Sequence, residues 1–335
     1  MAKEFLQMLF GLEPDYFFKL GDYSAYRVKN FIYIMVPVHR EEQREIEERY
    51  ELTRFLRERG ELYVPSFVPS QKGMYVNRWE HRYYILLRLE RWQEIPVLYP
   101  ATNLAGFHQR SMGDFTKIRA LQRFGKWQDL WEQRLQQLER VWQSIVMNGP
   151  GNEFETLFAD SFPYYAGLGE NAIQYFRDTL IDAPVDGMDA PVVCHEHFTE
   201  KTWGGPIVWK NPFDWVVDHP SRDLAEFSRS LYFRGTKVYM KPLRQFFSEY
   251  QSVYPLSSFG IRLMYSRLLL PLHYFQCVET YYSNPQDRSN VQLSVQLKNY
   301  MDRSDEYEAF LREFFDLLEV PHRKMQIPKP DWLSL

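Results

Sequence analysis

A few side chains in one stretch of the sequence have the types and spacing that phosphoryl transfer or metal binding would require. The stretch contains His195, Glu196, His197 and Thr202, and Asp214 follows shortly after. Histidine titrates near neutral pH and can accept a proton, while hydroxyl and carboxylate oxygens are the kind of ligand that Mg²⁺ prefers. This stretch is therefore the first candidate for a catalytic or metal-binding site.

The His195-Glu196-His197 triplet also permits a different chemistry. Residues two apart on a strand share a face, so both imidazole rings could bind one metal ion, as in some barrel hydrolases. Such a barrel needs roughly 250 residues, mostly after the motif, whereas the shorter remainder here is mainly helical in pattern. A metal hydrolase is therefore the third-ranked interpretation. Two simpler alternatives stay open: a hydrogen-bonded core role for His195, and a capping or pairing role for Asp214.

The elements that must position these residues fall into two groups. Aromatic and β-branched runs with turn residues between them predict strands, and a stretch with apolar residues at helical spacing predicts one helix that ends at Gly60. The predicted strands cover residues 16–18, 25–28, 31–38, 64–69, 73–76 and 83–89, with the helix at residues 40–59 between the third and fourth.

From residue 101 onward the pattern is mostly helical. Helices are predicted around Leu104, Phe107 and His108, then over residues 127–146 and 169–179, and in a series that Asp223 caps and that reaches Val320. Short β-like pieces are predicted at 192–197, 206–209 and 213–215, and an extended tail at 321–335. We therefore predict an α+β fold with a β-rich lobe at 1–92, a hinge near 90–100, and a helical lobe at 93–335 with a short β insertion at about 192–215. Kinase-like folds are organised in this order.

The residues at the candidate site resemble the catalytic and metal-binding loops of aminoglycoside-phosphotransferase-like kinases. Those enzymes have the pattern H-G-D-x-x-x-x-N, then D-[WF], then D-L-A; here the corresponding stretches are 195–202, Asp214-Trp215 and Asp223-Leu224-Ala225. Two further stretches, 104–108 and 164–175, resemble the YutH/CotS family of spore coat proteins within that superfamily. The resemblance covers nearly the whole chain and implies a two-lobed protein-kinase-like fold.

The resemblance assigns a role to each position. His197 stands where the kinases have the aspartate that accepts the substrate proton, and Thr202 stands where they have a metal-binding amide. Asp214 retains the metal-binding aspartate, and it is the one metal ligand that we expect. His195 and Asp223 match positions that brace the loop, whereas Glu196 replaces a glycine.

The N-terminal lobe lacks other parts of the machinery that the resemblance implies. Kinases hold the nucleotide phosphates with a lysine on the third strand, paired with a helix glutamate. Residues 31–38 contain no lysine, and Glu45, Glu47 and Glu48 are each interpreted as solvated residues of a helix face. The phosphate-covering turn offers only Gly21, beside Asp22 of the wrong sign.

We therefore predict a catalytically degenerate kinase-like protein that needs no cofactor. Losing the base alone costs roughly 10²–10⁴ in rate, and losing the lysine and a metal ligand removes the larger electrostatic contribution. The alternative is an atypical active phosphotransferase that uses His197, Asp214, ATP and Mg²⁺ on a small molecule or a coat protein. The resemblance implies other spore coat proteins as partners, synthesis in the cytoplasm of the mother cell, and deposition in the coat.

Composition excludes several other classes. The 40 basic and 44 acidic residues are interleaved, so no basic stripe predicts nucleic-acid binding. Cys194 and Cys277 are expected to be reduced thiols, and Cys194 points away from His195 on a strand, so no Cys/His nucleophile pair is expected. The apolar run 261–275 is broken by Arg262 and Pro271, among others, so it predicts a buried helix and no membrane span. No signal peptide is expected from the first residues, and the aromatic share of 17% favours a dense core.

Overall fold

The computed structural model describes residues 2–39, 42–92, 100–204, 207–235, 238–283 and 291–333. The chain forms two compact units. Unit 1 contains Met1–Arg123, Ala190–Asp223 and Ser252–Tyr254, and unit 2 contains Phe124–Asp189, Leu224–Gln251 and Pro255–Leu335. The predicted lobe boundary at residue 92 stays a prediction, because most of the predicted hinge lies outside the described residues.

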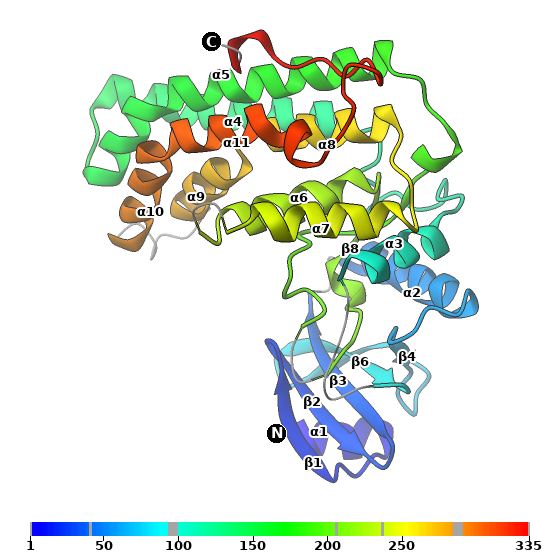
Figure 1. Ribbon diagram of the computed structural model, residues 1–335. Coiled ribbons are helices and arrows are strands. Elements are labelled where there is room, and N and C mark those ends of the chain that lie inside the picture. The colour runs from blue at the N-terminus through cyan, green and yellow to red at the C-terminus, as the bar shows by residue number, and fades with distance from the viewer. Residues whose placement is uncertain are drawn as a thin grey trace. The chain divides into compact units, whose positions relative to one another are not determined.

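Unit 1 is built on a six-stranded antiparallel sheet with the strand order β1-β2-β3-β6-β4, in which β5 also pairs with β6. Helix α1 (Ala2–Phe10) precedes the first strand of this sheet, and α2 (Gln43–Glu58) lies between its third and fourth strands in sequence. The strands are β1 (Tyr16–Leu20), β2 (Tyr23–Val28), β3 (Phe31–Val38), β4 (Ser66–Val68), β5 (Val76–Trp79) and β6 (Arg82–Leu89) (Figure 1). The predicted order of three strands, one helix and three strands is confirmed.

The two faces of this sheet bury different sets of side chains, as the alternation of a strand requires. On one face, Tyr33 of β3 packs with Phe5 and Leu6 of α1. On the other face, β3 presents a row of aliphatic side chains that pack with residues far along the chain. This second cluster contains Ile32, Ile34, Val36, Ile46 of α2, Ile207 and Trp209.

Several predicted elements of unit 1 differ from the observed ones. Helix α1 was not predicted, although its apolar residues cover a sheet face. The fifth strand begins at Val76 instead of residue 73, because the backbone of Ser70 and Gly73 forms a turn in which Ser70 N–H donates to Met74 O at 2.8 Å. The piece predicted at 206–209 forms no strand over residues 207–209, and Pro206 lies outside the described residues.

A two-stranded sheet carries the candidate site. Strand β7 (Val192–His195) pairs antiparallel with β8 (Trp215–Asp218), with His195 opposite Trp215. The short 3-10 helix Pro212–Asp214 precedes β8, and Asn211 caps it by accepting from Phe213 N–H at 3.1 Å. The predicted β-like piece at 213–215 is therefore a helical turn that leads into a strand.

Unit 2 is helical in its described part. Its longest helix, α5 (Glu153–Asp182), packs against α4, α8 and α10. The prediction of 169–179 was too short, because the capping Asn152 accepts from Glu155 N–H at 3.1 Å and the helix continues through Pro163. The other helices are α4 (Trp127–Asn148), α7 (Met240–Gln251), α8 (Ser258–Leu269), α9 (Leu272–Ser283), α10 (Val291–Asp302) and α11 (Ser304–Leu317), while α3 (Pro100–Ser111) lies in unit 1 and α6 (Ser221–Tyr232) spans the division (Figure 1).

The apolar run 261–275 forms parts of two buried helices, α8 and α9, which separate at Leu270 and Pro271. None of the helices in the described part of the chain is long and apolar enough to cross a membrane. The predicted extended tail instead turns at residues 321–327 and ends in the 3-10 helix Asp331–Leu333. Tyr175 on α5 holds this tail by donating to Pro328 O at 2.9 Å.

A buried histidine in unit 2 predicts how stability depends on pH. Burial, with a smaller contribution from the charge of Arg229, holds the pKa of His273 well below its ordinary value. Below about pH 6.5 this histidine binds a proton in the unfolded chain but not in the folded chain. Its contribution to the free energy of unfolding therefore falls by about 1.4 kcal/mol for each further pH unit.

We expect His273→Leu to flatten the fall in melting temperature between about pH 7.5 and about pH 5.5, since it removes this group. The matched change His81→Leu, at an exposed turn position, should leave the slope as it is in the unmodified protein. Thermal denaturation across this pH range measures both. The same slope in the His273 variant and the unmodified chain would contradict the assignment.

Candidate active site

Asp223 is the centre of the buried hydrogen bonds at the candidate site. Its Oδ1 accepts from the backbone N–H of His195 at 2.9 Å, and its Oδ2 lies 2.8 Å from Nδ1 of the same residue. Nε2 of His108 on α3 lies 3.1 Å from Oδ2. The prediction that Asp223 caps this helix was wrong, because α6 begins at Ser221 and Asp223 is its third residue. The carboxylate of Asp223 binds His195 at the end of β7 instead.

The ionisation of this cluster follows from its burial and pairing. Burial alone would raise the pKa of Asp223, but the charges and hydrogen bonds of His195 and His108 outweigh it, so that this pKa lies well below its ordinary value. Burial lowers the pKa of His108, although Asp223 opposes this. The cluster is therefore an ionised carboxylate with two histidines, a structural arrangement that fixes the backbone at His195.

The loop after β7 uses its polar side chains internally. Thr202 Oγ1 accepts from Thr199 N–H at 2.7 Å and lies 3.4 Å from the backbone carbonyl of His197. The side chain of His197 is exposed, whereas His195 is buried. Because β7 ends at His195, the two imidazoles do not share one face of a strand, and the geometry does not support the His-x-His metal pair.

Glu196 stands where the kinases that the sequence resembles have a glycine. Two arginines neutralise the carboxylate of Glu196. Its Oε2 accepts from Arg222 at 2.7 Å and its Oε1 from Arg123 at 3.4 Å. Arg222 also donates to Asp218 at 3.0 Å and to His195 O at 2.9 Å. The carboxylate of Glu196 therefore closes an ion network.

Asp214 matches the metal-binding aspartate of the kinases that the sequence resembles. Burial raises its pKa, while the charges of His195 and Arg49 and a hydrogen bond from Asn211 lower it in part. Its backbone carbonyl accepts from Glu196 N–H at 2.7 Å, which ties the two loops together. A half-buried carboxylate with a raised pKa is a poor sole ligand for Mg²⁺, since this ion needs several charged or polar oxygens.

Two adjacent charged residues of α2 hold the segments around Asp214. Arg49 Nη1 donates to Pro212 O at 2.8 Å and to Trp215 O at 3.1 Å, so its guanidinium spans the turn that contains Asp214. Glu48 accepts from the backbone N–H groups of three consecutive residues, Arg119, Ala120 and Leu121, at 2.9, 3.0 and 2.9 Å. The prediction that Glu48 belongs to a solvated face was wrong, because it is 6% exposed and serves as the anchor for this segment.

A buried lysine is the functional candidate that sequence reasoning missed. Lys210 is 2% exposed, pairs with Glu61, and lies over the rings of Phe107 and Trp203 at 5.0 and 4.5 Å. Burial lowers its pKa, and Glu61 raises it in part. Glu61 also accepts from Arg110 at 2.5 Å. The one signal in the sequence was a lysine inside an apolar run. The ion pair of Lys210 with Glu61 holds the segment between the two loops, and the ammonium group of Lys210 is used in this pair.

Among the described residues, one group of side chains has ligand atoms close enough for a metal ion. The candidate ligand atoms of His108, Cys194 and Asp223 all lie within 4.8 Å of one another, and all three residues are buried. Two of them bind each other, and Cys194 Sγ donates to His219 O at 3.3 Å. These groups satisfy one another with hydrogen bonds, so the cluster needs no ion to explain its burial.

The arrangement of sheet, catalytic-type loop and helices is that of the kinase-like fold. An aminoglycoside phosphotransferase from Alicyclobacillus acidocaldarius has a similar structure, with a TM-score of 0.67 and 14% identity over 93% of this chain and 96% of that one. A spectinomycin phosphotransferase in complex with ADP and spectinomycin is also similar, with a TM-score of 0.57 and 14% identity over 89% of this chain and 93% of that one. At this identity the likeness shows the fold alone.

The chain belongs to the family described as "Spore coat putative kinase YutH", whose sequence model matches residues 3–314. The endospore coat-associated protein YutH of Bacillus subtilis strain 168 is 35% identical over 312 residues, which cover 93% of this chain and 92% of that protein. The predicted fold class and the family resemblance are thus confirmed. The roles of His195, His197, Thr202, Asp214 and Asp223 stay predictions.

The contacts of Arg49 predict a large effect of one substitution. Arg49→Met keeps an unbranched apolar stem but leaves the carbonyls of Pro212 and Trp215 without their charged donor. We expect the free energy of unfolding to fall by about 3 kcal/mol, because each buried acceptor loses its partner. Chemical denaturation measures the change.

The matched control is Arg54→Met on the same helix. The side chain of Arg54 is 59% exposed and pairs at the surface with Glu51, so its loss should change stability by no more than about 0.5 kcal/mol. Equal losses in the two variants would show that Arg49 does not hold the turn.

Proposed function

We propose that this protein is a catalytically degenerate kinase-like protein that acts as a spore coat or coat-associated component. The observation that carries the degenerate part is the packing of the sheet face beneath β3. Where the kinase resemblance calls for a phosphate-binding lysine, Ile34 and Val36 are buried in one cluster with Trp209. Phosphates would meet an apolar surface there instead of a cation.

Electrostatics at Asp214 supports the same conclusion. Phosphoryl transfer depends mainly on positioning and on neutralising the phosphate charges with metal ions and cations. Here one carboxylate with a raised pKa stands next to the guanidinium of Arg49, which repels a second cation. The hydroxyl of Thr202 accepts from its own loop. Weak metal binding follows, and with it inefficient phosphoryl transfer.

The coat part of the proposal is supported by the family and by the name of its Bacillus subtilis relative, an endospore coat-associated protein. We propose the same association for this chain, with synthesis in the cytoplasm of the mother cell and other coat proteins as partners. No nucleic acid is proposed as a partner, because basic and acidic residues are interleaved.

An atypical active phosphotransferase is the second candidate. It is favoured by the retained carboxylate of Asp214 and the exposed imidazole of His197, which lie in the same unit. In that case ATP and Mg²⁺ would be required, and a small molecule or a coat protein would accept the phosphoryl group.

A complementation experiment separates the two candidates. Deleting the gene should change the protein composition of extracted spore coats, and the unmodified gene should restore it. We expect a gene with Asp214→Ala to restore it equally well, since a structural component does not need a metal ligand. Asp129→Ala, an exposed change on α4, is the matched control for expression and folding.

Two other outcomes contradict the proposal. Coats that are unchanged by the deletion contradict the coat role. Failure of the Asp214 variant alone, with normal amounts of folded protein and loss of phosphate transfer from γ-labelled ATP in the purified protein, favours the active phosphotransferase and overturns the degenerate one.

A further inference from the structure

A long groove runs along α2 in unit 1, apart from the loops of the candidate site. It has a volume of about 1460 Å³ and is lined by one stripe of α2, by side chains around β4 to β6, and by residues 114–118. The α2 stripe consists of Gln43, Ile46, Glu47, Tyr50, Glu51, Arg54, Phe55 and Glu58, and the buried Glu48 and Leu52 of the same helix also line the groove. With 3.6 residues per turn, this stripe lies on the side of the helix opposite Arg49.

The floor of the groove is aromatic. Tyr50 lies 5.6 Å from Phe67 and 5.0 Å from Tyr75 between ring centroids, and Phe55 lies 5.5 Å from Phe115. Met74 at the edge is 51% exposed. Tyr50, Phe55 and Tyr75 are half-buried, whereas Phe67 and Phe115 are buried beneath them. Covering the half-buried rings and the exposed methionine with an apolar partner is favourable, because it removes apolar area from water.

The rim on α2 is acidic. Glu47, Glu51 and Glu58 line the groove, and the one arginine of the stripe, Arg54, lies 2.7 Å from Glu51 and 3.9 Å from Glu58. Glu47 accepts from the amide of Gln43 at 3.1 Å and has no ion pair among the described residues. The stripe therefore carries three carboxylates against one guanidinium, an excess of two negative charges.

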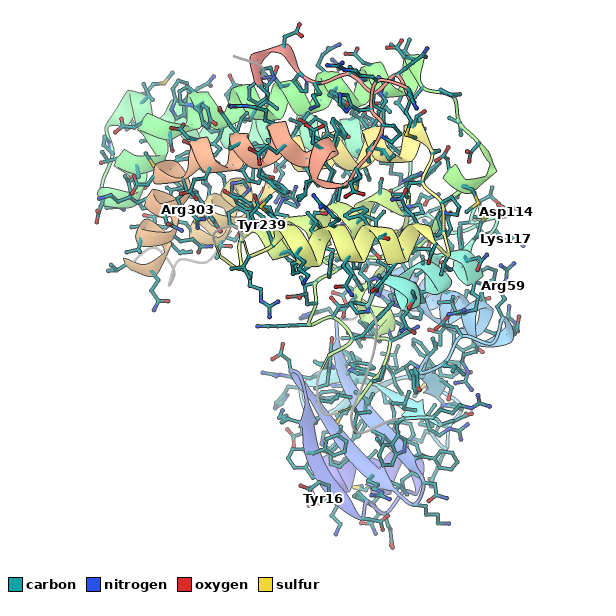
Figure 2. The ribbon with its side chains drawn as sticks, in the orientation of Figure 1. Tyr16, Arg59, Asp114, Lys117, Tyr239 and Arg303 are labelled. Atoms are coloured by element: carbon teal, nitrogen blue, oxygen red, sulfur yellow. The ribbon has the colours of Figure 1, made fainter. Side chains whose placement is uncertain are left out.

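The opposite wall has a mixed charge. Lys117 lies beside Asp114 (Figure 2), and hydrogen bonds from Thr116, together with the charge of Lys117, lower the pKa of Asp114. Arg78 donates to Glu80 O at 3.3 Å. Glu48 lines the groove as well, but its oxygens accept from the backbone at Arg119, Ala120 and Leu121. The charge that a ligand meets is thus concentrated along α2.

The size of the groove favours a polypeptide. Small-molecule pockets have roughly 300–1,000 Å³, and this groove is larger. The 16 residues of α2 extend for about 24 Å, which matches four turns of a second helix. A helix that lies in a groove presents apolar side chains at positions i, i+3, i+4 and i+7.

We propose that this groove binds an amphipathic helix of a partner protein that carries lysine or arginine on the flank that faces Glu47 and Glu51. Its apolar stripe covers the rings of Tyr50, Phe55 and Tyr75. This inference goes beyond the proposed function, because the groove is built without His197, Asp214 or the loop between them.

The test uses the full chain and two synthetic peptides of equal length. Both peptides have leucines at i, i+3, i+4 and i+7 over four turns; one has lysines on both flanks and the other has glutamates. Fluorescence anisotropy of labelled peptide measures the affinity. We expect the basic peptide to bind at least about tenfold more tightly than the acidic one, a difference that two or three rim charge pairs can supply.

Variants then locate the site. Glu47→Lys with Glu51→Lys should weaken the basic peptide about tenfold and strengthen the acidic one. The same change in charge on α4, Asp129→Lys with Glu139→Lys at exposed positions, should leave both affinities unchanged. Met74→Ser should weaken both peptides a few-fold, because it removes apolar contact area at an exposed position that folding does not depend on.

The outcomes that overturn the proposal are distinct from those that overturn the coat role. Binding of neither peptide, equal binding of both, or an unchanged preference in the Glu47/Glu51 variant would each overturn it. Sedimentation of the same variants excludes a second copy as the occupant: self-association that the Glu47/Glu51 change abolishes, without peptide binding, would also overturn it. Melting curves confirm that each variant is folded.

Discussion

The buried charges of α2 constrain the rest of unit 1. Arg49 holds the carbonyls on both sides of Asp214, and Glu48 holds three consecutive backbone N–H groups next to β8. The carbonyl of Leu121 in that segment accepts from Val217 N–H at 2.9 Å. Glu48 is therefore linked through this segment to β8, the strand that follows Asp214. Breaking the hydrogen bonds of a buried charge is strongly unfavourable, because the charge is left without a partner. Arg49 therefore fixes helix α2 to the turn that contains Asp214.

Under the proposed function, this constraint explains how a kinase-like fold persists while the machinery for phosphoryl transfer is degraded. In kinases a lysine on the third strand pairs with a helix glutamate, and metal ions neutralise the phosphates. Here Arg49 and Glu48 supply the contacts that fix the helix, and neither needs a nucleotide. Ile207 and Trp209 fill space beneath β3 with apolar side chains, and the Asp223 cluster holds β7. Each of these contacts stabilises the fold without a ligand.

Much of the fold was predictable because period-2 and period-3.6 patterns are strong in this chain. The six strands and α2 were found, since strands such as β3 have long β-branched and aromatic runs. Helix α1 was missed because a nine-residue element depends on the sheet that it covers. The candidate loops were found by spacing, whereas the roles of Glu48, Arg49 and Lys210 were not. A charged residue on an amphipathic helix is usually solvated, and only the tertiary fold shows that Glu48 and Arg49 reach backbone groups more than 70 residues away in sequence.

The most direct test of the central claim is a calorimetric titration of the purified full chain with ATP in the presence of Mg²⁺. With an apolar face where a cation is needed and Arg49 beside the remaining carboxylate, we expect no saturable binding at concentrations up to about 1 mM, which corresponds to about −4 kcal/mol. Removing Mg²⁺ should change nothing. Saturable, Mg²⁺-dependent binding in the micromolar range would contradict the account.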